Sequence, residues 1–155
     1  MKLMEKLLVI ITCATGIVLI VTAFIQIIYR FVIGDALPWP DELCQYAFMW
    51  SSLMGSVVVM ADNEHLRVDA FINLLPKSVH KYFDGLCLLV MAGFSAFTCW
   101  AGYEYTYELY DMEQIAQSMP ELKIWVVALC IPISFFLTTL FALRNFFRLF
   151  TQKHD

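Results

Sequence analysis

The sequence predicts an all-α integral membrane protein with four transmembrane helices. Apolar residues make up 61% of the 155 residues, and the mean hydropathy is +0.70. They are concentrated in four runs without any Asp, Glu, Lys or Arg: residues 7–29, 43–61, 86–103 and 124–143. Each run is close to the roughly 20 residues that a helix needs to cross a hydrocarbon core, and a helix satisfies its own backbone hydrogen bonds in lipid. We therefore expect one membrane domain, residues 1–155, with no separate soluble domain.

The basic residues predict the orientation of these helices. Eight of the ten lie before the first run, between the second and third runs, or after the fourth run; the other two connections hold only Arg30 and Lys123. By the positive-inside rule, both termini and the middle connection are expected in the cytoplasm. Eight of the fourteen acidic residues lie in the two outer connections, so most of the acidity faces outward, and we expect no nucleic-acid partner.

The first run, residues 7–29, has some features of a signal peptide, because Lys2 and Lys6 precede it. However, it is longer than the apolar part of a signal peptide, and no A-x-A cleavage pattern follows it. We expect a retained first span.

The second helix has a clear start signal. Pro40 suits the first position of a helix, and Asp41 and Glu42 suit its positive N-terminal end. Trp39 lies where interfacial aromatic residues anchor a span. We predict that Arg30 closes the preceding turn by pairing with Asp41 or Glu42. The alternative is an arginine that only reaches toward the lipid headgroups.

Small residues recur four positions apart in the second span, as Ser51 with Gly55 and Ser52 with Ser56. Such spacing lets membrane helices approach closely. We expect these faces to contact another helix, either in this chain or in a partner.

The connection between the second and third spans is predicted to contain an amphipathic helix at about residues 65–75. Its apolar residues recur at helical spacing, which is typical of a helix that lies on the membrane surface. We expect His65, Arg67 and Asp69 to hold this segment against the membrane or a partner. A short packed cytoplasmic helix and a solvated loop are the alternatives.

The last two spans differ in how they end. The third helix is expected to project beyond the bilayer, because Glu104, Glu108 and Asp111 continue at helical spacing after the apolar run. In the fourth span, Pro132 predicts a kink, with Ser134 or Thr138 helping to satisfy the freed carbonyl.

The spans lack the side chains that membrane catalysis and proton transfer require. All three histidines lie outside them, they contain no carboxylate, and the five cysteines form no paired motif. We expect no enzyme activity, no cofactor and no metal site. One alternative is a four-span membrane enzyme such as a glutathione-dependent transferase, with Arg67, Lys77, Lys81 and Arg144 lining a basic pocket. A small free-standing channel or exporter is another, but the spans are uniformly apolar.

An ordered series of motifs runs through residues 30–76. It consists of Arg30-Phe31-Val32-Ile33-Gly34, Trp39-Pro40-Asp41-Glu42-Leu43, Gly55, Glu64-His65-Leu66-Arg67-Val68-Asp69 and Leu75-Pro76. The series resembles the small, Q-type (DctQ-like) membrane subunit of tripartite ATP-independent periplasmic (TRAP) transporters. Phe31 departs from that family, which often has Tyr at this position and so a hydroxyl that this chain lacks.

The resemblance implies a non-catalytic subunit of the bacterial inner membrane. Its expected partners are a large, M-type transport subunit, a periplasmic binding protein that delivers an organic acid, and membrane lipids. In that family an ion gradient, usually sodium, drives uptake, and the large subunit moves as an elevator. The small subunit is then expected to anchor the static scaffold, and the acidic surface at residues 104–113 to help receive the binding protein.

Overall fold

The computed structural model describes residues 2–34, 37–61 and 77–151, and these residues are mainly helical. The elements are α1 (Lys2–Ile28), a π-helical turn (Tyr29–Ile33), α2 (Pro38–Ala61), α4 (Lys77–Asp111), α5 (Ile124–Ala128) and α6 (Cys130–Thr151). Four segments are long and apolar enough to cross a membrane: Lys6–Ile33, Pro38–Ala61, Phe83–Asp111 and Ile124–Leu149. The prediction of an all-α protein with four such helices is therefore confirmed.

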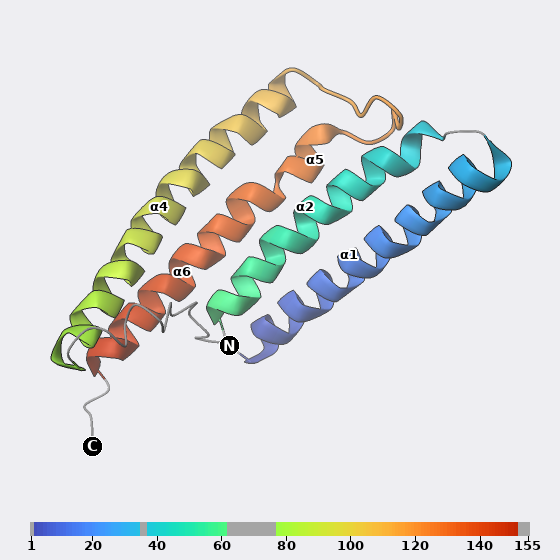
Figure 1. Cartoon of the computed structure of the whole chain (residues 1–155). Coiled ribbons are helices and arrows are strands. Elements are labelled where there is room, and N and C mark those ends of the chain that lie inside the picture. The colour runs from blue at the N-terminus through green and yellow to red at the C-terminus, as the bar shows by residue number, and fades with distance from the viewer. Residues whose placement is uncertain (1, 35–36, 62–76, 152–155) are drawn as a thin grey trace.

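The four long helices lie side by side in one layer rather than in a closed bundle. Helix α1 packs on α2, α2 on α6, and α6 on α4, so that the spatial order is α1–α2–α6–α4 (Figure 1). We call the end of the layer with the α1–α2 and α4–α5 connections the loop end. The opposite end, where α1 begins and α2 and α6 finish, we call the tail end.

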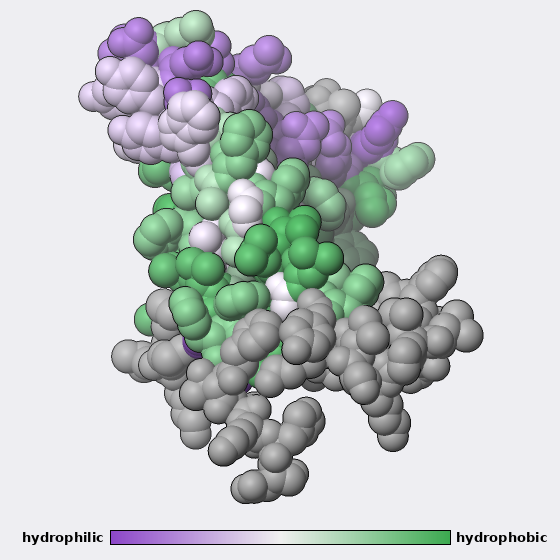
Figure 2. Space-filling view, turned by 90° about the vertical axis from the view of Figure 1, so that its left-hand side faces the viewer, coloured by the Kyte–Doolittle hydropathy of each residue, from purple (hydrophilic) through white to green (hydrophobic). Residues whose placement is uncertain are grey.

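A single layer leaves both of its faces uncovered by the other described helices. Only 11% of the most apolar window of the first span is buried, and the share reaches 33% in the fourth span. Figure 2, which views the α4 side, shows a polar cap at the loop end above a broad apolar band. Apolar surface of this extent marks contact with lipid or with another protein.

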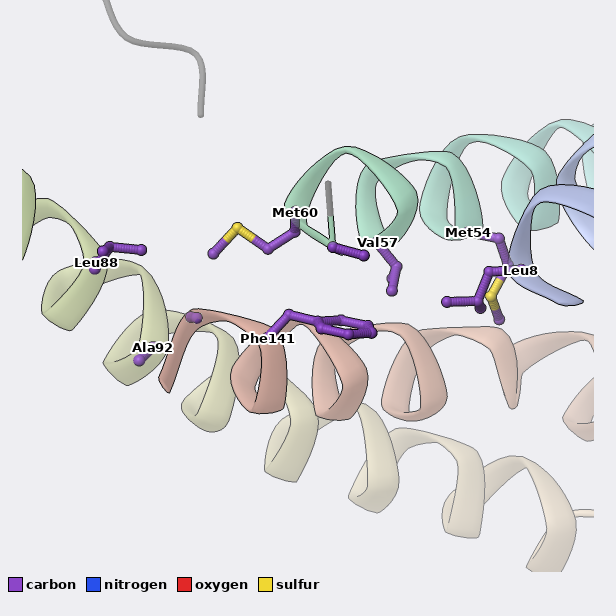
Figure 3. Close-up of a cluster of buried hydrophobic side chains, with 9 residues drawn as sticks. Leu8, Met54, Val57, Met60, Leu88, Ala92 and Phe141 are labelled. Atoms are coloured by element: carbon purple, nitrogen blue, oxygen red, sulfur yellow. The ribbon is translucent and has the colours of Figure 1, made fainter. Parts of the chain in front are cut away.

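The interior of the layer lies where α2, α6 and α4 meet, toward the tail end. Val57 of α2 and Phe141 of α6 are almost completely buried, and Leu88 and Ala92 extend the cluster onto α4 (Figure 3). Leu8 contributes from α1. The cluster joins α2, the second helix in the chain, to the two C-terminal long helices.

Helices α4 and α6 approach closely at Gly102. A Cβ atom built there would lie 2.7 Å from Cγ2 of Ile131, too close for any other residue type without a shift. Closer to the tail end, the hydroxyls of Ser95 and Thr139 share a 2.8 Å hydrogen bond between the two helices. Small residues and polar contacts of this kind hold membrane helices together where lipid removes the hydrophobic driving force.

The fourth span is interrupted for one residue, Leu129, whose backbone keeps α-helical angles. Pro132 has no N–H, so the carbonyl of Ala128 lacks its usual donor four residues later, and α5 ends at Ala128. The chain continues as α6 from Cys130. The hydroxyls of Ser134 and Thr138 donate to the carbonyls of Ile131 and Ser134, so the expectation that either satisfies the freed carbonyl is wrong.

Candidate functional site

A clamp built on Glu42 is the main polar feature of the loop end. Helix α2 begins at Pro38, which places Glu42 in its first turns. The Glu42 carboxylate accepts a hydrogen bond from the Tyr46 hydroxyl at 2.6 Å. It also accepts the backbone N–H groups of Gln117 at 3.1 Å and Ser118 at 2.8 Å. We call the Glu42 carboxylate and these two N–H groups the loop clamp.

The loop clamp joins the start of α2 to the segment that connects α4 with α5. That segment is also closed on itself, because Ala116 N–H donates to the Leu122 carbonyl at 2.9 Å and Ile124 N–H donates to the Gln114 carbonyl at 3.1 Å. Hydrogen bonds to a carboxylate are stronger than those between neutral groups. The clamp therefore fixes two parts of the chain that lie some 75 residues apart in the sequence.

Asp41 is bonded to Gln26 of α1, and the predicted Arg30 pair is absent. The Gln26 side-chain amide donates to the Asp41 carboxylate, while Glu42 is engaged in the loop clamp. Arg30 lies exposed on the π-helical turn and makes no ion pair with either carboxylate within the described ranges. The antiparallel register of α1 and α2 is the reason, since it brings Gln26, one turn before Arg30, opposite Asp41.

Gly34 and Trp39, which were also predicted as structural residues, lie on either side of the connection between α1 and α2. Gly34 ends the π-helical turn with φ at +76°, a left-handed conformation that glycine adopts without the usual steric cost. Trp39 lies half-buried in the first turn of α2. Gly34 thus ends the first span, and Trp39 belongs to the start of the second, both at the loop end.

The two small-residue faces of α2 have different surroundings. A Cβ atom on Gly55 would lie 3.6 Å from Thr12 of α1, and one on Gly16 of α1 would lie 3.6 Å from the Ser51 hydroxyl. The Ser51 and Gly55 face therefore packs on α1.

Ser52 and Ser56 are exposed, on the part of α2 that the other described helices leave uncovered. Their hydroxyls donate to carbonyls of their own helix, those of Met49 and Leu53. This second face is available to a partner or to lipid.

At the tail end, α6 caps the last carbonyls of α2. The Arg144 guanidinium donates to the Ala61 carbonyl at 2.6 Å and to the Asn145 side-chain oxygen at 3.2 Å. The Asn145 amide, which is 3% exposed, donates to the Met60 carbonyl at 3.0 Å. These carbonyls have no donors within their own helix, and a cation is favourable at the negative end of the helix dipole. We call these contacts of Arg144 and Asn145 the helix cap.

Three predicted residues, His65, Arg67 and Asp69, lie outside the described residues, as does the predicted interfacial helix at 65–75. Across residues 2–34, 37–61 and 77–151, no three His, Cys, Asp or Glu side chains gather into a possible metal site. The arrangement thus consists of helix-positioning contacts at both ends of an apolar layer. Sequence reasoning did not find the loop clamp or the helix cap, because their partners are backbone groups far along the chain.

Comparison with known proteins gives a family match over most of the chain. Residues 17–152 match the family model described as "Tripartite ATP-independent periplasmic transporters, DctQ component". The C4-dicarboxylate TRAP transporter small permease protein DctQ of Rhodobacter capsulatus is 28% identical over 105 residues, which is 68% of this chain and 46% of that protein. The sialic acid TRAP transporter permease protein SiaT of Haemophilus influenzae is 32% identical over 57 residues, 37% of this chain and 9% of that protein. The matched region thus spans about half of the first relative and a small part of the second.

Proposed function

The chain belongs to the DctQ-component family of TRAP transporters, and on this premise we propose that it is the small membrane subunit of such a transporter. The family is a transporter component and not an enzyme, and the chain is a multi-pass membrane protein. The alternative of a glutathione-dependent transferase has no support.

The single-layer arrangement is the observation that carries the proposed role. A layer with both faces apolar and only 11–33% of its span windows buried offers a broad surface to a larger membrane protein. Permanent complexes typically have large and apolar interfaces. The layer lies against a large transport subunit and acts as the fixed part past which that subunit's mobile region slides.

The two ends of the layer support this scaffold role. The loop clamp and the helix cap both tie helices that are distant in sequence, so the layer resists shear between its two halves. The exposed Ser52 and Ser56 face is offered to the large subunit. His65, Arg67 and Asp69 hold the inner connection against the membrane or that partner, with an interfacial helix at about 65–75.

The remaining parts of the proposal concern the transport reaction and the setting. A periplasmic binding protein delivers an organic acid, and an ion gradient, with sodium as the coupling ion, drives its uptake. The names of the two relatives refer to a C4-dicarboxylate and to sialic acid, which are both organic acids. The whole chain is one domain in the bacterial inner membrane, with both termini cytoplasmic, as the distribution of basic residues indicates.

The proposal is tested by reconstitution. The large subunit is placed in proteoliposomes with or without this chain, and uptake of a labelled organic acid is measured with the binding protein and a sodium gradient. We expect uptake only when this chain is present and the gradient is imposed. Equal uptake by the large subunit alone would contradict a scaffold role.

A further inference from the structure

A pocket of about 250 Å³ lies at the loop end, between the end of α4 and the start of α5. Its lining consists of Tyr110, Asp111, Glu113, Lys123 and Trp125. None of these side chains takes part in the loop clamp or the helix cap. The volume is below the roughly 300–1,000 Å³ of most drug-sized sites, so the pocket suits a small polar group.

The side chains of the lining suit a ligand that carries both a positive and a negative group. Asp111 and Glu113 offer carboxylates, and Lys123 offers an ammonium; in the described part of the chain none of the three is held in an ion pair. The rings of Tyr110 and Trp125 lie edge to face with centroids 5.6 Å apart. Aromatic faces attract cations, and carboxylates accept hydrogen bonds from ammonium groups. The lysine complements an anionic group next to that cation.

The depth of the pocket points to lipid. Tyr110 and Asp111 close the third membrane-spanning segment, Lys123 directly precedes the fourth, and Trp125 is the second residue of that fourth segment. The Trp125 side of the pocket thus lies at the depth where Trp and Tyr are enriched, and Tyr110 and Asp111 reach it from the part of α4 that continues past its apolar run. The buried indole N–H of Trp125 has no acceptor among the described residues.

Glu113, which carries one of the two carboxylates, has an uncommon backbone conformation. Glu113 has φ at +49°, two residues after the end of α4, and its N–H donates to the Tyr110 carbonyl at 3.2 Å. Glycine adopts this left-handed conformation more readily than glutamate does. Glu113→Gly therefore removes the carboxylate from the pocket and leaves the turn intact, which makes it a clean test variant.

We propose that the pocket binds the headgroup of phosphatidylethanolamine. The ammonium donates to the carboxylates of Asp111 and Glu113 beside the two rings, and the phosphate is bound by Lys123. Phosphatidylcholine lacks the N–H donors, and anionic phosphatidylglycerol is disfavoured because two carboxylates outweigh one lysine. A basic side chain from a protein would engage the carboxylates but would bring no anionic group for Lys123. The proposal does not depend on the transport role.

The test follows Trp125 itself by fluorine NMR. The full chain is labelled with 5-fluorotryptophan, which reports on its four tryptophans, and the Trp125 signal is assigned with Trp125→Phe. In phosphatidylcholine nanodiscs, stepwise replacement by phosphatidylethanolamine should shift the Trp125 signal to saturation. Phosphatidylglycerol should leave it in place, and the Trp50 signal, assigned with Trp50→Phe, should not follow the titration.

Variants decide whether the shift comes from the pocket. Asp111→Asn and Glu113→Gly should each weaken the apparent affinity about tenfold, since each removes hydrogen bonding to a charged group. Glu108→Gln, which alters an exposed carboxylate of α4 outside the pocket lining, should not change it. The variants are folded if the fluorine signals of the other tryptophans and the circular dichroism spectrum are unchanged.

The other outcomes overturn the proposal. An equal Trp125 signal in all three lipids, or a shift that survives in both pocket variants, would show that the pocket does not select this headgroup. A response only to soluble glycerophosphoethanolamine would assign the pocket to a free metabolite. A response only to arginine amide would assign it to a protein side chain.

Discussion

The contact at Gly102 allows a quantitative test of how α4 and α6 pack. In Gly102→Ala the new methyl group would lie 2.7 Å from Cγ2 of Ile131 and 3.4 Å from the backbone nitrogen of Pro132. Overpacking of this kind costs about 1–3 kcal/mol. On the same helix, a Cβ atom on Gly93 would meet nothing within 4 Å. Gly93→Ala should therefore keep only the benefit of replacing a helical glycine, about 0.5–1 kcal/mol.

The free energy of unfolding is measured by titrating SDS into mixed micelles and following helicity. We expect Gly102→Ala to be less stable than Gly93→Ala by about 1–3 kcal/mol, because both share the helix-propensity gain and only one carries the clash. Adding Ile131→Ala removes the clashing methyl group, so the double variant should show a favourable coupling energy between the two positions. Equal stability of the two glycine variants, or zero coupling with Ile131, would refute the close approach.

Three further predictions concern the other contacts. Glu42→Gln should loosen the α4–α5 connection, seen as faster hydrogen exchange at the Ser118 amide; unchanged exchange would argue against the loop clamp. Asn145→Leu should lower the free energy of unfolding by about 1–3 kcal/mol, because it leaves a buried carbonyl without its donor; an unchanged SDS midpoint would contradict the helix cap. Gly55→Leu should destabilise the isolated chain by about 1–3 kcal/mol through overpacking against α1, whereas Ser56→Leu should spare the isolated chain and weaken co-purification of the large subunit. If Ser56→Leu destabilised the isolated chain and Gly55→Leu did not, the assignment of the internal and external faces of α2 would be wrong.

The presence of four long apolar helices could be predicted because length and hydropathy depend only on local sequence. Helix α2 begins at Pro38 and α4 continues to Asp111, and both of these end segments are less apolar than the spans. The apolar runs at 43–61 and 86–103 are therefore shorter than the two helices. Helical spacing of Glu104 and Glu108 did predict that the third helix continues past its apolar run.

The order of the helices could not be predicted, since any pairing of four apolar helices hides a similar amount of surface. The error at Arg30 has the same origin. Charge suggested a pair with Asp41 or Glu42, but the register of α1 against α2 decided the partner and selected Gln26.

Glu42 shows a related limit. Its position in the first turns of α2 favoured a role at the helix dipole, and the structure gives it the backbone of Gln117 and Ser118 instead. A backbone donor has no signature in the sequence. The fold brings it to the carboxylate by packing α2, α6 and α4 into one layer.

The most direct test of the central claim is to purify the tagged chain from its native membrane in mild detergent and identify by mass spectrometry what accompanies it. We expect one large multi-span transport subunit in equal amount, because the chain belongs to a transporter-component family and offers it a broad apolar layer. Recovery of this chain alone, stable and monodisperse, would contradict the claim that it is the scaffold of a larger transporter.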